Sequence, residues 1–274
     1  MLKISQALRL IHISWVLIKH GLDEVILATH LFRPVRFLQY LTPWYWLRRD
    51  MKPRGMRIRR ALEELGPIFV KFGQILSTRR DLLPDDIADE LAHLQDRVPP
   101  FSAEKSRKII EKAYGRPISE VFLEFETEPF ASASISQVHG AVTKDHQSVV
   151  VKVLRPNILK IIKRDVSLLK IIAELAERYW KDGKRLKPIE VVAEYEKTIL
   201  DELDLIREGA NASQLRRNFQ DSAELYVPYV NWDLTQTNLL VIERIQGTPI
   251  GNIQELIDQN IDLKLLATRG VEIF

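Results

Sequence analysis

The spacing of apolar residues changes once along this chain of 274 residues, and that change limits the folds it can adopt. Up to about residue 116, apolar residues recur with the period of an α-helix, and the segment Gly115-Arg-Pro117 ends the pattern. From Val121 onward, short β-branched or aromatic runs alternate with turn-forming residues, which is typical of strands. Five strands are predicted: VFLEF (121–125), QVHGAVT (137–143), SVVVKVL (148–154), LYVPYV (225–230) and NLLVIERI (238–245).

A long helical segment, 158–180 and 189–219, separates the third predicted strand from the fourth. This order of three strands, helices and two strands resembles the small lobe of a protein kinase, in which a helix interrupts a five-stranded antiparallel sheet. We therefore expect an α+β fold with most of the large lobe missing. Its predicted parts are a helical N-terminal extension (1–116), a kinase-like small lobe with a helical insert (117–247) and the start of a large lobe (248–274).

The composition fits a globular protein and argues against a nucleic-acid partner. Hydrophobic residues make up 46% of the chain, and a formal net charge of +3 is too small a surplus to indicate nucleic-acid binding. The absence of cysteine excludes disulfides and thiolate metal sites. The six histidines show no ligand spacing, so no metal-binding residue is predicted within the chain.

Two features near the N-terminus fit either a membrane surface or ordinary protein structure. One is the segment Arg48–Arg60, which has seven basic residues and one acidic residue and follows the aromatic cluster 44–46. A solvated basic run explains it equally well. The other is an amphipathic helix, which could lie on a membrane or pack on its own domain. Its apolar stripe is predicted to contain Leu8, Ile11, Trp15, Ile18 and Leu22.

The stretch ASASISQV (131–138) lies between the first two predicted strands. It follows the kinase glycine-loop pattern G-x-G-x-x-G-x-V, with Ala131, Ala133 and Ser136 at the glycine positions and Val138 at the valine. Because glycine lets backbone N–H groups approach phosphate closely, residues with a Cβ should form a stiffer phosphate cover. The predicted nucleotide-binding residues here are Phe130, Ala131, Ser132, Ala133, Ser134, Ile135, Ser136, Gln137 and Val138.

Lys152 lies among valines in the third predicted strand, where its ammonium group needs either solvent or an anionic partner. It follows Val138 by fourteen residues and resembles the kinase lysine that holds nucleotide phosphates and pairs with a helix glutamate. Glu202, Asp204 and Glu208 offer such a partner, and an amphipathic helix could present them at two heights on one flank. A lysine pointing into water from an edge strand is the alternative.

Four motifs in this order resemble the UbiB family of atypical kinases, called the ADCK family in eukaryotes. They are KFGQ (71–74), ASAS (131–134), VVVKV around Lys152, and ELD (202–204) followed by REGANA (207–212). The resemblance implies that the KFGQ helix packs over a kinase-like active site and meets the acidic motif. The resemblance covers nearly the whole chain.

The resemblance also implies individual roles. Lys71 would contact Glu202 or Asp204, Gln74 would hydrogen-bond on the same helix face, and Gly73 would permit close approach. The periodicity supports part of this, since positions 71, 74 and 78 fall on one stripe of an apolar helix. Snorkelling could also explain Lys71. The predicted catalytic residues are Lys152, Glu208, Lys71, Gln74, Glu202 and Asp204.

By the same resemblance, ATP and Mg²⁺ are the expected cofactors, and the backbone from Glu243 to Ile245 is the candidate hinge for adenine. The histidine-and-aspartate catalytic loop and the D-F-G-type segment do not occur in the sequence. We therefore interpret the chain as an N-terminal fragment that lacks turnover, with metal ligands and C-terminal membrane anchors expected after Phe274.

The implied role is ubiquinone biosynthesis at the cytoplasmic face of the bacterial inner membrane, with quinone-biosynthesis proteins or lipid intermediates as partners. A different interpretation is a membrane-associated regulatory or lipid-presenting adaptor whose nucleotide pocket is vestigial.

Overall fold

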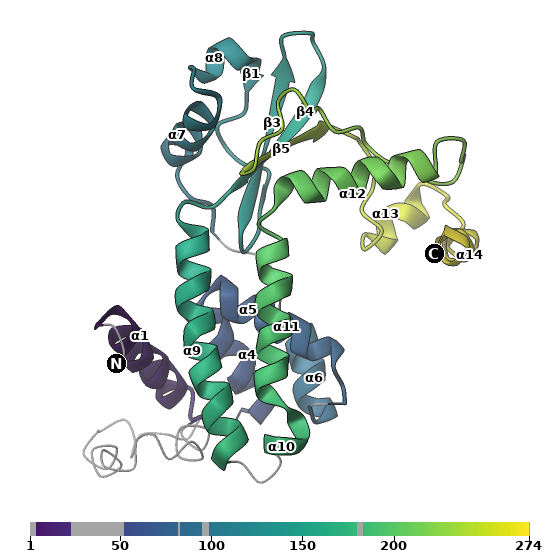
Figure 1. The fold of residues 1–274 in the computed structure, drawn as a ribbon. Coiled ribbons are helices and arrows are strands. Elements are labelled where there is room, and N and C mark those ends of the chain that lie inside the picture. Colours follow the sequence, from purple (N-terminus) through teal and green to yellow (C-terminus); the bar gives the residue numbers. More distant parts are fainter. Residues whose placement is uncertain (1–3, 23–51, 82, 95–98, 180–182, 274) are drawn as a thin grey trace. The chain divides into compact units, whose positions relative to one another are not determined.

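The computed structural model describes residues 4–22, 52–81, 83–94, 99–179 and 183–273 (Figure 1). The chain divides into two compact units, and each is described by itself. The helical unit comprises residues 1–100, 132–136 and 155–203, and the sheet unit comprises residues 101–131, 137–154 and 204–274. The domain boundaries predicted from the sequence stay predictions.

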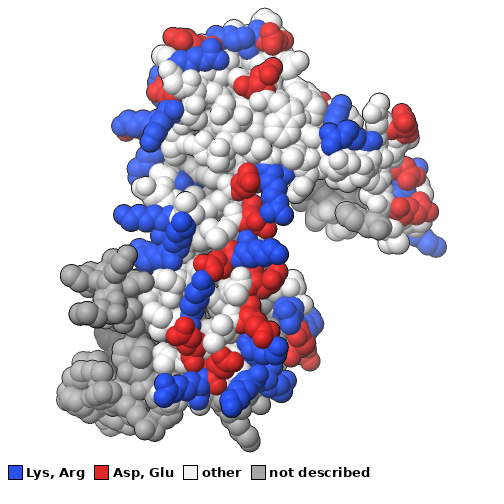
Figure 2. All heavy atoms as spheres, viewed as in Figure 1, with Lys and Arg blue, Asp and Glu red and all other residues white. Residues whose placement is uncertain are grey.

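The helical unit is built from two groups of helices, with α9 beside α11 in one group and α4, α5 and α6 packed together in the other (Figure 1). On the face shown in Figure 2, basic and acidic side chains are interspersed over these helices, and Lys170 of α9 pairs with Glu196 of α11. The helices are α1 (Ile4–Lys19), α4 (Arg54–Leu65), α5 (Pro67–Thr78), α6 (Asp85–Ala92), α9 (Ile158–Tyr179), α10 (Gly183–Leu186) and α11 (Pro188–Asp201).

Helices α4 and α5 meet at a sharp corner that glycine and proline create. Gly66 has φ of 104°, a value that side chains with a Cβ rarely adopt, and it caps both helices. Pro67 follows at the first position of α5, where its missing N–H costs nothing. The corner turns Ile68, Phe69 and Val70 into the core of the unit.

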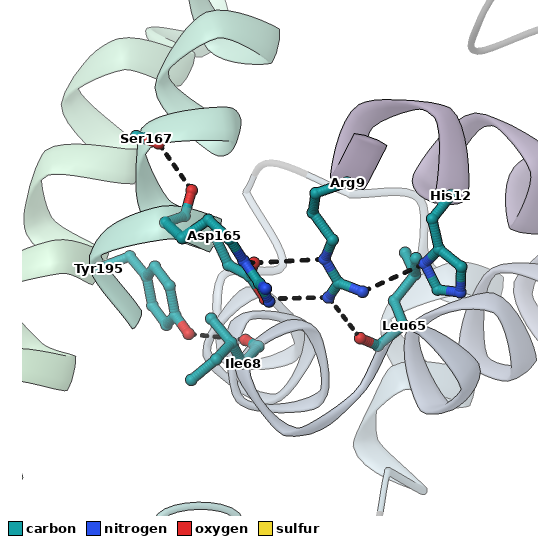
Figure 3. A network of polar contacts seen from close by, with 8 residues as sticks. Arg9, His12, Leu65, Ile68, Asp165, Ser167 and Tyr195 are labelled. Carbon is teal, nitrogen blue, oxygen red and sulfur yellow. Dashed lines mark hydrogen bonds and ion pairs between the residues drawn. The ribbon is translucent and has the colours of Figure 1, made fainter. Parts of the chain in front are cut away.

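A buried ion pair joins α1 to α9 and to this corner (Figure 3). Arg9 donates from Nη2 to Asp165 Oδ2 at 2.9 Å and to the carbonyl oxygen of Leu65 at 2.7 Å. Leu65 ends α4, so its carbonyl has no partner within the helix and needs one from outside. Asp165 is 1% exposed and also accepts a hydrogen bond from Arg164 Nε at 2.8 Å.

Tyr195 makes a second polar link, from α11 to α5. Its hydroxyl group donates to the carbonyl oxygen of Ile68 at 2.6 Å (Figure 3). Its ring packs edge-to-face on Phe72, with the ring centroids 5.1 Å apart. Burial raises the pKa of Tyr195, so the phenol stays a neutral donor. The bond fixes α5 against α11.

The predicted stripe of the first helix is partly wrong. Ile11 and Trp15 are 62% and 56% exposed, whereas Ile13 and Val16 are buried. The helix is rotated relative to the prediction because Arg9 must point inward to reach Asp165, which places its neighbours on the helical stripe, Ile13 and Val16, in the core. Leu22 is buried as a stripe residue should be. The side chain of Leu8, the aromatic cluster 44–46 and residues 48–51 of the basic run lie outside the described residues.

The sheet unit confirms the expected α+β fold with a five-stranded antiparallel sheet. The strands follow the order β1-β3-β4-β5, and β2 pairs with β3. Helix α7 covers one face of the sheet, and α12 packs on β5. The elements are α7 (Ala103–Tyr114), α8 (Ile118–Val121), β1 (Phe122–Phe125), β2 (Ala131–Ser132), β3 (Ser136–Thr143), β4 (Ser148–Leu154), α12 (Leu205–Asn218), β5 (Leu239–Glu243), α13 (Ile253–Asp258) and α14 (Leu263–Ile273).

The two faces of the sheet differ in burial. Val149, Val151 and Val153 of β4 are fully buried in a core with Ile110 of α7, whereas the alternate residues Val150 and Lys152 are only partly buried. The core face also holds His139, whose Nδ1 lies 2.8 Å from the carbonyl oxygen of Glu126. Desolvation lowers the pKa of His139. The face that carries Lys152 is therefore the one open to chemistry.

Two predicted elements are wrong. The run 225–230 is not a strand: Pro228 in its middle has no N–H for a ladder, and only Val230 forms an isolated bridge, to Ile242. The pair Ala131–Ser132 supplies the fifth strand instead. The predicted helix 189–219 is two helices, because Asp204 starts α12 by accepting a hydrogen bond from the backbone N–H of Arg207 at 3.1 Å. Among the described helices, none is both long and apolar enough to cross a membrane.

We predict that Arg9→Met lowers the free energy of unfolding of the helical unit by about 2–3 kcal/mol. The buried carboxylate of Asp165 would keep only some of the hydrogen bonds that offset its burial, and the Leu65 carbonyl would lose its donor. Lys19→Met is the matched control on the same helix. Its exposed pair with Glu64 should contribute about 0–1 kcal/mol. Urea unfolding followed by helical circular dichroism measures both, and equal effects would contradict the prediction.

Candidate functional site

Lys152 forms a two-pronged ion pair on the open face of the sheet. Its Nζ lies 2.7 Å from Oε1 and 2.8 Å from Oε2 of Glu208, which belongs to the first turn of α12. The two side chains are 26% and 43% exposed, so water still reaches the pair. The structure thus brings together a lysine and a glutamate that are 56 positions apart in the sequence.

Gly209 explains how α12 comes close enough to the sheet. A Cβ at this position would lie 3.1 Å from a methyl group of Leu240 and 3.2 Å from the ring of Trp232. Leu240 is the cross-strand partner of Lys152 in the β4–β5 ladder. Packing Gly209 on Leu240 therefore sets its neighbour Glu208 over the lysine. Asp204, which caps the same helix, fixes where its first turn begins.

A pocket of about 620 Å³ lies within the sheet unit, beside the end of β5. Its walls come from the loop before β2, the start of β4 and the segment after β5. It contains the predicted loop residue Phe130 and both predicted hinge residues, Glu243 and Ile245, while Val150 and Ile242 provide apolar surface. Pockets of this size accommodate small organic ligands, and an apolar floor with backbone groups at one edge suits a flat heterocyclic base.

Both the side chain and the backbone N–H of Glu243 already make hydrogen bonds. Its carboxylate accepts a hydrogen bond from the hydroxyl group of Tyr226 at 2.6 Å, and its backbone N–H donates to the carbonyl oxygen of Tyr229 at 3.0 Å. The carboxylate therefore holds the segment before β5 against the strand. Ile245 is 54% exposed in the pocket wall.

Arg244 is a pocket residue that the sequence analysis missed. Its guanidinium group pairs with Glu126 at 2.5 Å and lies over the ring of Phe130, 5.6 Å from the centroid. Any side chain at Gly140 would collide with this pair. Nothing in the sequence indicated the contact, because Glu126 lies 118 positions away from Arg244.

The alanine-rich loop forms a tight hairpin. The backbone N–H of Ala133 donates to the carbonyl oxygen of Ser136 at 2.9 Å, which closes a two-residue turn. Ser134, Ile135 and Ser136 are buried, and Val138 is partly buried. Gln137 turns its side chain to the core face of the sheet, where its amide oxygen accepts from the N–H of Phe101 at 3.0 Å. Gln137 could therefore meet a nucleotide only through its backbone.

In the helical unit, Lys71 of α5 pairs with Glu202, the residue that follows α11, at 2.9 Å. Gln74 donates to the carbonyl oxygen of Leu94 at 3.1 Å. Gly73 permits a close approach, as expected, and the side chains that come close to it are those of Leu62 and Leu94. The Lys71–Glu202 pair and the Lys152–Glu208 pair are thus each present, and whether they face one cleft stays a prediction.

Among the described residues, no group of three or more histidine, aspartate or glutamate side chains could hold a metal ion. The residues fit a nucleotide better than a metal by themselves: they offer a partly exposed ammonium group, a loop of backbone amides and a pocket lined by both polar and apolar residues.

Comparison with known proteins identifies the family of this chain. Residues 93–274 match the ABC1 atypical kinase-like domain. The chain belongs to the ABC1 atypical kinase-like family. The resemblance to UbiB proteins is confirmed by curated relatives called "Probable protein kinase UbiB".

One such relative, from Marinobacter nauticus, is 54% identical over 97% of this chain and 49% of its own length. Another, from Pseudomonas aeruginosa, is 55% identical over 100% of this chain and 52% of its own length. The chain therefore spans about half the length of the curated relatives it matches. Among solved structures, Rv3197 from Mycobacterium tuberculosis in complex with erythromycin is 26% identical, with 71% of this chain and 49% of that chain covered and a TM-score of 0.49.

We predict that Gly73→Ala destabilises the helical unit by about 1–3 kcal/mol, because the added methyl group would lie 2.5 Å from Leu94 and 2.7 Å from Leu62. Gly270→Ala in α14 is the control, since a Cβ there meets nothing within 4 Å. It should be neutral or stabilising by up to about 1 kcal/mol through helix propensity. Urea unfolding of the two variants makes the comparison, and a neutral Gly73→Ala would refute the packing role.

Proposed function

We propose that this chain is the N-terminal half of a UbiB-like ATPase or atypical kinase that supports ubiquinone biosynthesis and binds Mg-ATP. The family, and the 54% identity to a relative called a probable protein kinase, support the kinase-like chemistry. The observation that carries the proposal is the Lys152–Glu208 pair, at 2.7 Å, on the same sheet as a pocket that holds the hinge residues. An ion pair with a purely structural role would not need to lie on the same sheet as such a pocket.

Different residues would bind the phosphates and the base of the nucleotide. Glu208 would hold the ammonium group of Lys152 in place, and this group would donate strong charge-assisted hydrogen bonds to phosphate oxygens. The pocket beside β5 would take the base, with hydrogen bonds from the backbone between Glu243 and Ile245. The loop 130–138 would cover the phosphates. Bound Mg²⁺ would neutralise phosphate charge, held by residues after Phe274.

Lys71, Gln74 and Gly73 would hold the KFGQ helix in place as a cover that restricts access by large acceptors. The Lys71–Glu202 pair and the bond from Gln74 to Leu94 support a fixed position for this helix. Such a cover favours a small or lipid acceptor over a protein chain. The proposed partners are quinone-biosynthesis proteins or lipid intermediates at the cytoplasmic face of the bacterial inner membrane. Without the catalytic and metal-binding loops, the chain would have no turnover by itself.

We predict that Lys152→Ala in the full-length protein weakens Mg-ATP binding by about 10- to 100-fold and abolishes ATP hydrolysis, because one charged hydrogen-bond partner of phosphate is removed. Calorimetric titration and phosphate release measure the two quantities. The variant should fold, since Glu208 is 43% exposed and can be solvated when its partner is lost.

Lys144→Ala is the matched control, because this lysine is exposed in the neighbouring β3–β4 turn and donates only to the carbonyl oxygen of Ser119. It should bind and hydrolyse ATP as the unsubstituted protein does. Unchanged hydrolysis in Lys152→Ala would reject the catalytic assignment.

A second candidate function, a membrane-associated adaptor, is favoured by one observation. Trp15 and Ile11 stand exposed on α1, and Lys19 lies over the Trp15 ring, 5.1 Å from its centroid. An aromatic ring beside a basic side chain suits the interface of an anionic membrane. In this function the nucleotide pocket would be vestigial.

For this candidate we predict that the chain floats with vesicles that contain anionic lipid, and that Trp15→Glu abolishes flotation because it places a charge at the buried depth of the interface. Ile189→Glu is the control, since Ile189 is also exposed in the helical unit but lies on α11. Failure of the unsubstituted chain to float would remove the support for the adaptor.

A further inference from the structure

The end of α12 and the loop that follows it (Figure 1) form another pocket of the sheet unit, of about 290 Å³. Half of its lining residues carry hydrogen-bond donors, and the others are apolar or aromatic. The donors are on Arg216, Arg217, Gln220 and Ser222, and the remaining walls are Phe219, Leu225, Tyr226 and Val227. The acids of the same loop, Asp221 and Glu224, do not line the pocket. It therefore offers positive charge beside an apolar surface.

Arg216 is held in place by contacts that leave most of its guanidinium group available. Its Nη1 donates to the carbonyl oxygen of Val227 at 2.6 Å, and the group lies over the ring of Tyr226, 5.7 Å from the centroid. This ring is fixed in turn, because its hydroxyl group donates to Glu243. Among the described residues, no hydrogen bond uses Nε or Nη2 of Arg216. Since a guanidinium group has five N–H donors, several can serve a ligand.

Other donors of the pocket are available as well. Arg217 donates from Nη2 to the side-chain oxygen of Gln214 at 2.7 Å, and within the described part of the chain its other N–H groups make no hydrogen bond. The hydroxyl oxygen of Ser222 accepts from the backbone N–H of Glu224 at 3.1 Å, which leaves the hydroxyl proton for another acceptor. A ligand in the pocket can therefore meet donors from both the helix and the loop.

Arginines in the last turn of a helix often offset its macrodipole, and that role alone would need no pocket. Here neither guanidinium group donates to a carbonyl oxygen of α12, since Arg216 bonds to Val227 and Arg217 bonds to a side chain. The C-terminal end of a helix disfavours an anion only weakly compared with what charge-assisted hydrogen bonds contribute. The arrangement of the two arginines thus fits ligand binding better than helix stabilisation.

We propose that this pocket binds a small organic carboxylate with a flat apolar body, about the size of benzoate. The planar guanidinium groups of Arg216 and Arg217 match the two oxygens of a carboxylate. The apolar body would lie against the aromatic and aliphatic walls. The volume is at the small end for ligand pockets, which favours a compact molecule. The site is at the opposite end of α12 from Glu208 and shares no lining residue with the pocket beside β5, so it does not depend on nucleotide binding.

The test measures the Kd of benzoate and of its neutral analogue benzamide for the full-length protein, by ligand-observed NMR titration. We expect benzoate to bind with a Kd of about 1 mM or tighter and benzamide at least about tenfold more weakly, because only the carboxylate uses the charged donors. Arg216→Met and Arg217→Met should each raise the Kd of benzoate at least about fivefold and leave that of benzamide within about twofold. Arg107→Met, which removes an exposed arginine of α7 in the same unit, is the control and should bind both ligands normally.

Hydrogen–deuterium exchange locates the bound molecule. Saturating benzoate should slow exchange in peptides that span residues 216–227 and leave those that span residues 148–154 unchanged. Arg217→Met keeps the bond between Arg216 and Val227, so this variant separates loss of the ligand from loss of the pocket wall. Unchanged benzoate binding in Arg217→Met would overturn the proposal. Equal affinity for benzoate and benzamide, or protection only outside residues 216–227, would overturn it as well.

Discussion

A lysine in the middle of a valine-rich strand must find an anion or reach water, and this requirement governs the sheet unit. Lys152 satisfies it with both carboxylate oxygens of Glu208. The pair can form only if α12 lies close to β5, which the missing side chain of Gly209 permits. Because the opposite face of β4 is filled by Val149, Val151 and Val153, the lysine has a single direction to point. Packing of the core on one face of β4 thus fixes the direction in which Lys152 points on the other face.

The helical unit uses polar contacts for a different purpose, which is to fix helices whose apolar faces alone would allow sliding. Arg9 bonds to α9 and to the end of α4, and Tyr195 bonds α11 to the first turn of α5. Both contacts end on carbonyl groups near the Gly66–Pro67 corner, and that of Leu65, at the end of α4, has no partner within its own helix. The position of Lys71 follows from these bonds, since α5 is held on the side of α11 and its lysine meets Glu202 where that helix ends.

The sequence predicted the features that depend on the local spacing of residues. A β-branched run between turn-forming residues located β4, and the motif order located the two lysines and their acids. It failed where a distant contact decided the outcome. The stripe of α1 was misassigned because the inward-facing Arg9 has its partner 156 positions away. The segment 225–230 has strand-forming residues but contains Pro228, and the two-residue strand β2 is too short to give a periodic signal. Arg244 was missed for the same reason, because partners in a distant loop leave no pattern in the sequence.

Because the chain breaks between α11 and α12, Glu202 and Asp204 of the acidic motif have different structural roles, which a single continuous helix could not give them. Glu202 belongs to the helical unit and pairs with Lys71, whereas Asp204 belongs to the sheet unit and caps the N-terminus of α12. The cap fixes where α12 begins, and Glu208 lies one turn later, at the carboxylate position that Lys152 needs. One acid therefore acts by direct ion pairing and the other by starting a helix. The two acids lie on either side of Leu203, one at the end of α11 and the other at the start of α12, and the motif is better understood as a helix boundary than as a pair of equivalent carboxylates.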